Sequence, residues 1–149
     1  MTLLEALFKL TYADPRPAKA RLEEGVRRIH DAFPRHQFTG VYLLRGETLE
    51  LVAFSGPETE HTRIPIGQGL CGKAVTQQRD LDIGDVNAEP EYLACSLTTK
   101  SEAIALIWKE GRIIGQIDID SDTAGAFGTD AMRQLRACAD LLAPLCAQC

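Results

Sequence analysis

The first 33 residues have apolar positions at the spacing of amphipathic helices. Thr2 and Glu5 have the spacing of a capping box at the start of a short helix, which the two prolines of 14–17 interrupt. A second helix is predicted over 18–33, where apolar residues recur at steps of three and four until Pro34 ends the pattern.

Beyond this helical region the periodicity becomes that of strands. Strands are predicted at 39–44, 48–55, 63–66, 81–83, 102–109 and 112–118. The third of them is expected at an edge of the sheet, because Pro65 has no N–H for a ladder. Glu110 and Gly111 are predicted to form a tight hairpin between the last two strands.

Two further helices complete the pattern and determine the fold class. A short helix is predicted over 69–77, and a closing helix begins at Thr129 as its N-cap and frays at Pro144. This order predicts an α+β fold, with about six antiparallel strands and the N- and C-terminal helices packed on one face. A chain of 149 residues fits one domain, so 1–149 is expected to be a single unit in which 1–35 forms the N-terminal helices.

Composition and charge narrow the class of protein. Hydrophobic residues make up 45% and charged residues 25% of the chain, as in ordinary globular domains. A net charge of -5 without any block of Lys and Arg argues against binding to nucleic acid. No apolar run approaches the roughly 18 residues of a membrane span, and the N-terminus lacks the features of a signal peptide. We therefore expect a cytoplasmic protein that has no membrane partner.

The 67–72 segment matches the G-x-G-x-x-G pattern of dinucleotide-binding proteins. That fingerprint requires a buried parallel strand before it and a full crossover helix after it. Here the preceding strand contains Pro65, the following helix is short, and the other strands are antiparallel. The glycines are therefore predicted to form a tight corner between strand and helix, which leaves the helix N-terminus open to an anionic group.

Two cysteines and three acidic residues carry the candidate chemistry. Cys71 is predicted at a helix N-terminus, where the helix dipole lowers the pKa of a thiol. Cys95 is predicted in a long loop, where a thiol is accessible. Glu102 begins one strand of the hairpin, while Asp118 and Asp120 end the next. The three carboxyl groups are therefore expected to meet at the end of the sheet opposite the hairpin turn.

The remaining cysteines, histidines and acidic residues also have explanations that involve no catalysis or ligand binding. Cys138 lies on the apolar face of the last helix and is expected to be structural, and Cys71 itself could be a small buried hydrophobic residue. Cys146 and Cys149 form a C-x-x-C pair that is either structural or a relay of reducing equivalents. The acidic residues at 118–122 could be a solvated strand end or a weak cation site, but they match no calcium loop. The histidines have no metal-ligand spacing, and no metal site is predicted.

Several segments together resemble one known family. They lie at 38–44, 64–74, 94–95, 100–102 and 113–121. The combination of two cysteines, a Ser-Glu pair and an Asp-x-Asp-Ser motif resembles the free methionine-(R)-sulfoxide reductases over roughly residues 38–145. This family consists of single GAF-type domains, so the resemblance implies a GAF-like fold with a six-stranded antiparallel sheet. It also leaves a homodimer open.

The resemblance implies a role for each residue of the candidate site. Cys95 corresponds to the nucleophile of the family and Cys71 to a resolving thiol. Tyr42 and Phe38 correspond to residues that line the pocket for the methyl-sulfoxide end of the substrate. The carboxylates that correspond to those holding the substrate are Glu102, Asp118 and Asp120.

The chain departs from the family pattern at three positions. His61 stands where family members commonly have another cysteine, Phe38 replaces a usual tryptophan, and Ser96 replaces a usual aspartate. Without a thiol at position 61, Cys71 becomes the leading resolving residue.

The implied activity is thiol-dependent reduction of free methionine-(R)-sulfoxide. The Cys95 thiolate attacks the sulfoxide sulfur, Glu102 supplies a proton, and the resulting sulfenic acid condenses with Cys71. Asp118 and Asp120 pair with the substrate ammonium group. A thioredoxin-like reductant supplied by NADPH then restores the thiols, and no bound cofactor is expected. The alternative is a non-catalytic GAF module that binds a small molecule or senses redox state.

Overall fold

The computed structural model describes residues 1–33, 35–90, 92 and 98–149. Its strands are β1 (His36–Arg45), β2 (Thr48–Ser55), β3 (Arg63–Pro65), β4 (Leu81–Ile83), β5 (Ser101–Lys109) and β6 (Arg112–Ser121). Its helices are α1 (Leu3–Tyr12), α2 (Ala18–Ala32), α3 (Gly69–Gln77) and α4 (Thr129–Cys146), with a short 3-10 helix η1 (Val86–Ala88). Within the described ranges, no helix has the length and apolarity that crossing a membrane requires.

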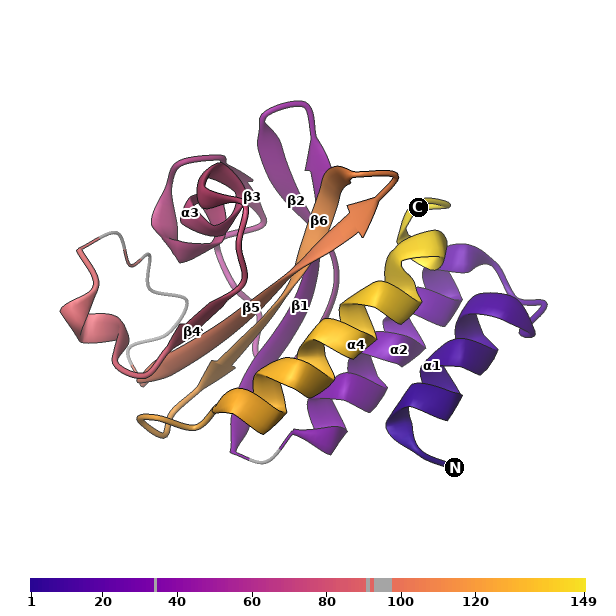
Figure 1. The fold of residues 1–149 in the computed structure, drawn as a ribbon, viewed down its shortest axis with the longest axis horizontal. Helices are drawn as coiled ribbons and strands as arrows, with labels where there is room; N and C mark the ends of the chain where they lie inside the picture. The colour runs from indigo at the N-terminus through magenta and orange to yellow at the C-terminus, as the bar shows by residue number, and fades with distance from the viewer. Residues whose placement is uncertain (34, 91, 93–97) are drawn as a thin grey trace.

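The six described strands form one antiparallel sheet in the order β3-β2-β1-β6-β5-β4. β3 lies at an edge, as Pro65 predicts, and pairs only with β2. Helices α1, α2 and α4 pack together over one face of the sheet, and α3 lies on the other face (Figure 1). The predicted α+β class, with terminal helices on one face, is confirmed.

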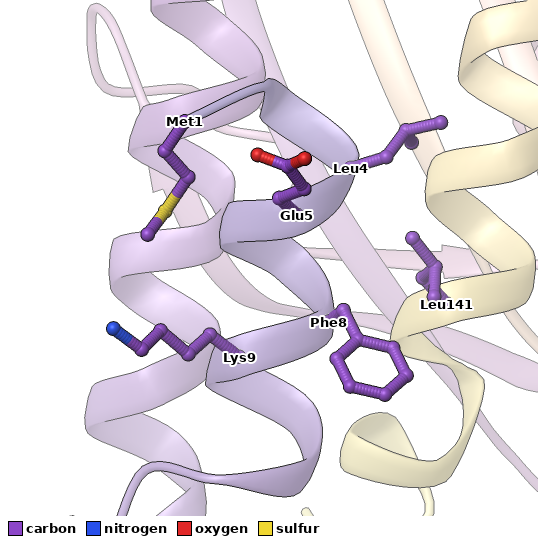
Figure 2. A pocket seen from close by; sticks show the side chains of 6 residues that line it. All are labelled: Met1, Leu4, Glu5, Phe8, Lys9 and Leu141. Atoms are coloured by element: carbon purple, nitrogen blue, oxygen red, sulfur yellow. The ribbon is translucent and has the colours of Figure 1, made fainter.

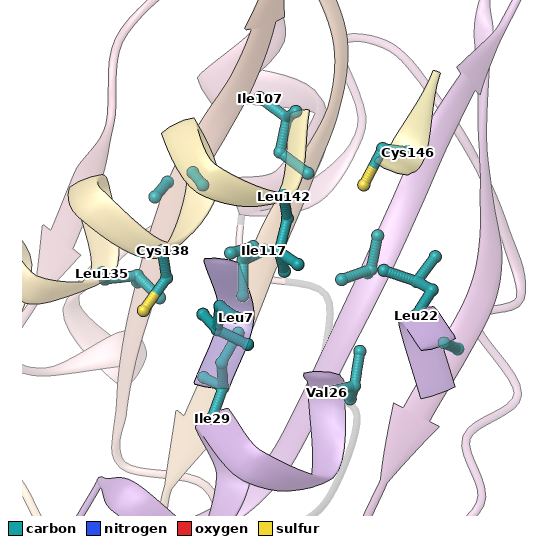
Figure 3. Close-up of a cluster of buried hydrophobic side chains, with 14 of the residues drawn as sticks. Leu7, Leu22, Val26, Ile29, Ile107, Ile117, Leu135, Cys138, Leu142 and Cys146 are labelled. Carbon is teal, nitrogen blue, oxygen red and sulfur yellow. The ribbon is translucent and has the colours of Figure 1, made fainter. Parts of the chain in front are cut away.

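The larger apolar core lies between the sheet and the three terminal helices. Leu7, Val26 and Ile117 meet there from α1, α2 and β6 (Figure 3). Cys138 is fully buried in this core, and burial raises the pKa of its thiol to about 12. Burial likewise raises the pKa of Cys146 to about 12. Both thiols stay protonated at neutral pH, which makes them poor nucleophiles.

The N-terminal helices begin as the sequence predicts. The Thr2 side chain accepts a hydrogen bond from the Glu5 backbone N–H at 3.1 Å, and the Glu5 carboxylate accepts one from the Thr2 N–H at 2.9 Å. This capping box satisfies two of the free N–H groups of α1. α2 starts at the predicted residue and ends at Ala32, one residue earlier than expected.

Both ends of α4 differ from the prediction. Gly128 is the N-cap and Thr129 is already helical, because the Gly128 carbonyl accepts the first helical hydrogen bond, from the Met132 N–H at 2.8 Å. Pro144 lies inside the helix and does not fray it. The residues after it remain helical because Leu145 and Cys146 are buried against the core, and this packing outweighs the lost backbone bond.

The central strands are longer than their apolar patterns predict. β1 begins at His36 and β6 continues to Ser121, three residues beyond each predicted limit. The added segments pair with one another, with Phe38 opposite Asp120. The apolar pattern ends where polar residues begin, but in the structure these polar residues continue the ladder, and Asp120 among them lies on the face of the candidate site.

The glycine-rich segment forms the predicted corner before α3. Gly67 and Gly69 have φ of 89° and 63°, in the region that favours glycine. A Cβ at Gly72 would lie 2.6 Å from the Gly67 nitrogen, so the chain folds back closely on itself. Because the described sheet is entirely antiparallel, the parallel strand of a dinucleotide-binding unit is missing from the described part of the chain.

Candidate active site

Three rows of residues cross the central strands on the face opposite to α1, α2 and α4. From β1 through β6 to β5, the rows are Phe38–Asp120–Glu102, Gly40–Asp118–Ile104 and Tyr42–Gln116–Leu106. Alternate residues of a strand point to one face, and the intervening residues, such as Val41 and Ile117, belong to the core beneath the helices. The register therefore brings Glu102, Asp118 and Asp120 together, as the hairpin predicts.

Helix α3 adds the Cys71 thiol to this group. Cys71 is the third residue of α3, and its Sγ lies 4.0 Å from Oε2 of Glu102. The Cys71 sulfur and one carboxylate oxygen each of Glu102 and Asp118 all lie within 4.8 Å of one another. The predicted position at a helix N-terminus is confirmed, and the side chain is buried among polar groups as well as apolar ones.

Gln116 fixes the position of Cys71 and was not among the predicted site residues. Its Nε2 donates a hydrogen bond to the Cys71 carbonyl at 3.0 Å, which joins α3 to β6. The side chain is fully buried in the row next to Asp118. The available signal was alternation, because Gln116, Asp118 and Asp120 are polar residues at every second position of β6, with isoleucines between them.

The acidic side chains are almost completely removed from solvent. Glu102 is 4%, Asp118 0% and Asp120 1% exposed. Neither carboxylate oxygen of Asp118 accepts a hydrogen bond of ordinary geometry from a described residue, and its polar neighbours are Glu102, Cys71 and Asp120. Burial raises the pKa of Asp118 above its ordinary value of 3.8, and the neighbouring polar groups offset only part of that effect. The site therefore favours either a bound proton or a cationic ligand.

Two aromatic residues lie in the same rows as the acidic and polar residues of the site. The family resemblance implies that both line the substrate pocket, and this role stays a prediction. Tyr42 is fully buried, and its hydroxyl donates a hydrogen bond to the His61 carbonyl at 2.8 Å. This bond brings position 61, where the family commonly has a cysteine, next to the site. Phe38 is buried and stacks on Phe54 of β2, with ring centroids 6.0 Å apart.

Residues 98–100, which lead into β5, are bonded to the start of β1 and the end of β6. Cys95 and Ser96 lie outside the described residues, so the predicted nucleophile has no described position. Thr98 and Thr99 both bond to the side chain of Gln37, at the start of β1. The Lys100 N–H donates to the Ser121 carbonyl at 2.7 Å. Residues 98–100 are thereby held beside the strand ends that carry Phe38, Asp120 and Glu102.

A hollow on the other side of the molecule has a different character. It has a volume of about 540 Å³ and lies on α1 and α4 (Figure 2). Its lining residues are Met1, Leu4, Glu5, Phe8, Lys9 and Leu141. This lining is mainly apolar and contains no thiol, unlike the group of acidic residues and Cys71 on the opposite face of the sheet.

Comparisons with known proteins agree with this architecture. The structure of the type II free methionine-R-sulfoxide reductase of Thermoplasma acidophilum superposes with a TM-score of 0.84 at 36% identity, covering 87% of this chain and 92% of that one. The chain belongs to the free methionine-R-sulfoxide reductase family. The structure of the Neisseria meningitidis enzyme with its substrate has a TM-score of 0.89 at 29% identity, covering 98% of this chain and 87% of that one. A solved GAF domain also superposes with a TM-score of 0.84 at 26% identity, which confirms the GAF-like fold.

Curated sequences lead to the same family. The free methionine-R-sulfoxide reductase of Escherichia coli is 36% identical over 99 residues, which cover 66% of this chain and 59% of that protein. The chain spans about three-fifths of the length of the first curated relatives it matches, with shares of 57%, 59% and 61%. None of the protein-family models matches the chain.

Proposed function

We propose that the chain reduces free methionine-(R)-sulfoxide to methionine by thiol chemistry. The observation that carries this proposal is the buried group of Cys71, Glu102 and Asp118, with mutual ligand-atom distances within 4.8 Å, in a chain of the reductase family. A thiol beside several carboxyl groups supplies what sulfoxide reduction requires, namely a sulfur that accepts oxidation and a source of protons.

The acidic residues select a free amino acid in this proposal. Asp118 and Asp120 pair with the substrate ammonium group, which compensates the charge of the buried Asp118 carboxylate more fully than its polar neighbours do. A methionine sulfoxide residue within a polypeptide has no ammonium group, so it would leave a buried carboxylate without a partner. Tyr42 and Phe38 provide apolar surface for the methyl-sulfoxide end.

The reaction proceeds in two balanced steps. The Cys95 thiolate attacks the sulfoxide sulfur to form an S–S bond, and Glu102 delivers a proton to the sulfoxide oxygen. The resulting hydroxyl group passes from the methionine sulfur to the Cys95 sulfur as the S–S bond breaks, so methionine leaves and Cys95 becomes a sulfenic acid. The Cys71 thiol then attacks the Cys95 sulfur, which forms a disulfide and releases water. An external dithiol of the thioredoxin class reduces this disulfide by exchange, with NADPH as the electron source and no bound cofactor.

A coupled assay tests the function. The protein is incubated with thioredoxin, thioredoxin reductase, NADPH and one epimer of free methionine sulfoxide, and NADPH oxidation is followed. We expect turnover of the R epimer alone, its loss in Cys95→Ser, and full activity in Cys149→Ser, because Cys149 lies at the end of α4 away from the site. Binding of the R epimer without turnover would instead favour the non-catalytic GAF module.

A further inference from the structure

The groups that surround Cys71 also form a donor set for a metal ion. We propose that Cys71, Glu102 and Asp118 bind a thiophilic divalent cation of the zinc class, through one sulfur and two carboxylate ligands. The three residues are far apart in sequence and have no ligand spacing, so the sequence predicts no metal site here. The site arises because α3 places a thiol over two neighbouring strands of the sheet.

The distances are close to those that coordinate a small cation. The three ligand atoms lie within 4.8 Å of one another, and the Cys71 sulfur is 4.0 Å from the Glu102 oxygen. Tetrahedral zinc, with its sulfur at ~2.3 Å and oxygens at ~2.0–2.2 Å, requires ligand atoms roughly 3.3–3.8 Å apart. Small side-chain rotations therefore suffice, while the register of β5 and β6 keeps Glu102 and Asp118 adjacent.

The Asp118 carboxylate provides a separate indication that this group accommodates a cation. It is 0% exposed, and neither oxygen accepts a hydrogen bond of ordinary geometry from a described residue, although the side chains of Glu102, Cys71 and Asp120 lie close enough to offset part of the effect of burial on its pKa. Buried polar groups without partners are uncommon, and a bound ion is one of the species that satisfies them. Gln116 Oε1, on the same face of β6, is a second buried oxygen without a described partner.

The thiol determines which cations fit. Calcium and magnesium take oxygen ligands, six or more in number, and a thiolate is a poor donor for either. Zinc and cobalt accept a mixture of sulfur and carboxylate oxygen in tetrahedral geometry. When the cation binds, the Cys71 thiol releases its proton to solvent and the metal–sulfur bond forms, with no change of oxidation state.

One consequence rests on the proposed function. A cation on Cys71 and Asp118 occupies both the resolving thiol and the partner of the substrate ammonium group. Metal binding would then exclude the substrate and block disulfide formation. The metal site itself depends only on the side-chain geometry, so it can be tested without any activity.

Cobalt(II) is the direct probe, because a thiolate ligand gives an intense near-ultraviolet absorption and tetrahedral geometry gives visible bands. The test uses a Cys95→Ser/Cys149→Ser background, in which the remaining thiols other than Cys71 are the buried Cys138 and Cys146. We expect the near-ultraviolet and visible absorptions to saturate at one equivalent of cobalt and to disappear when zinc is added. Both absorptions should be absent after the further change Cys71→Ser. Asp118→Asn should weaken binding about tenfold or more.

Asp122→Asn is the matched control, since Asp122 is an exposed acid just past β6 and should leave binding unchanged. Thermal unfolding of each variant verifies that it is folded. Saturation at one equivalent with loss in the Cys71 variant supports the site. Persistence of the bands without Cys71, or their absence in a folded background protein, overturns it. Cobalt binding in a chain without reductase activity would refute the proposed function alone.

Discussion

Glu102 on β5 lies directly opposite Asp120 on β6, with both side chains buried on the same face of the sheet. Like charges in directly opposed positions of a sheet destabilise it. The fold thus keeps two acids where stability alone would disfavour them, beside the third acid and the thiol. This arrangement is typical of a functional site, and it leads to separable roles for the two residues.

Glu102→Gln and Asp120→Asn should have different kinetic effects. If Glu102 supplies the proton, its change to Gln lowers kcat by about 100-fold or more, because general acid catalysis contributes on this scale. Asp120→Asn removes a partner of the substrate ammonium group and should mainly raise KM. Steady-state kinetics with the R epimer separates the two. Equal effects of both changes on KM alone would exclude Glu102 as the proton donor.

Asp118→Asn should stabilise the protein and impair substrate binding. Burial raises the pKa of Asp118 above 3.8, so the folded state holds this proton more tightly than the unfolded state does. Stability therefore falls as pH rises above 3.8, until the folded state also loses the proton. The change to Asn removes this loss and should raise the free energy of unfolding on the order of 1 kcal/mol at pH 8.

The gain in unfolding free energy from Asp118→Asn should be smaller at pH 4. At that pH the unmodified protein has lost little of the stability that it loses when the pH rises further. Urea unfolding at the two pH values measures it, with Asp122→Asn as an exposed control that leaves stability unchanged. Destabilisation by Asp118→Asn at pH 8 would show that the carboxylate is compensated in the folded state.

Gly72→Ala should destabilise the corner before α3. The added Cβ would lie 2.6 Å from the Gly67 nitrogen, a backbone atom that cannot move aside easily. Overpacking of this kind costs roughly 1–3 kcal/mol. Gly84→Ala is the control, since the nearest atom to its Cβ would be 4.0 Å away. Thermal unfolding of the two variants gives the comparison, and equal melting temperatures would contradict the predicted clash.

Gln116→Leu tests whether the bond to the Cys71 carbonyl positions the thiol. The change removes the 3.0 Å hydrogen bond between β6 and α3, and leaves a buried carbonyl without its partner. We expect a loss of about 1 kcal/mol in unfolding free energy. A positioning role also predicts slower formation of the Cys71 disulfide with unchanged KM. A purely structural role would lower stability without altering the rate of disulfide formation.

The resolving step can be observed directly. After one turnover without reductant, mass spectrometry should detect a disulfide between Cys71 and Cys95, because His61 leaves no thiol at the usual position. Cys71→Ser should stop turnover with thioredoxin after the sulfenic acid forms, while Cys149→Ser should behave as the unmodified chain. Normal multiple turnover in the Cys71 variant would assign the resolving role elsewhere.

Local pattern was sufficient to predict most of the elements. β2, α3 and β4 have the predicted bounds, since their apolar periods are flanked by glycine or polar residues. The pattern failed where packing overrode local preference. Pro144 stays within α4 because the last turn is buried, and β1 and β6 extend into polar sequence because their ends pair with each other.

The sequence by itself determined the α+β class, the hairpin of β5 and β6, and the meeting of their acidic residues. Hydrophobic periodicity and strand alternation act over a few residues, so they can be recognised along the chain. Only the tertiary structure decided that Cys71 faces Glu102 and Asp118, that Gln116 holds its backbone, and that Phe54 stacks on Phe38. These contacts join segments distant in sequence, and they depend on how α3 and β2 pack against the central strands.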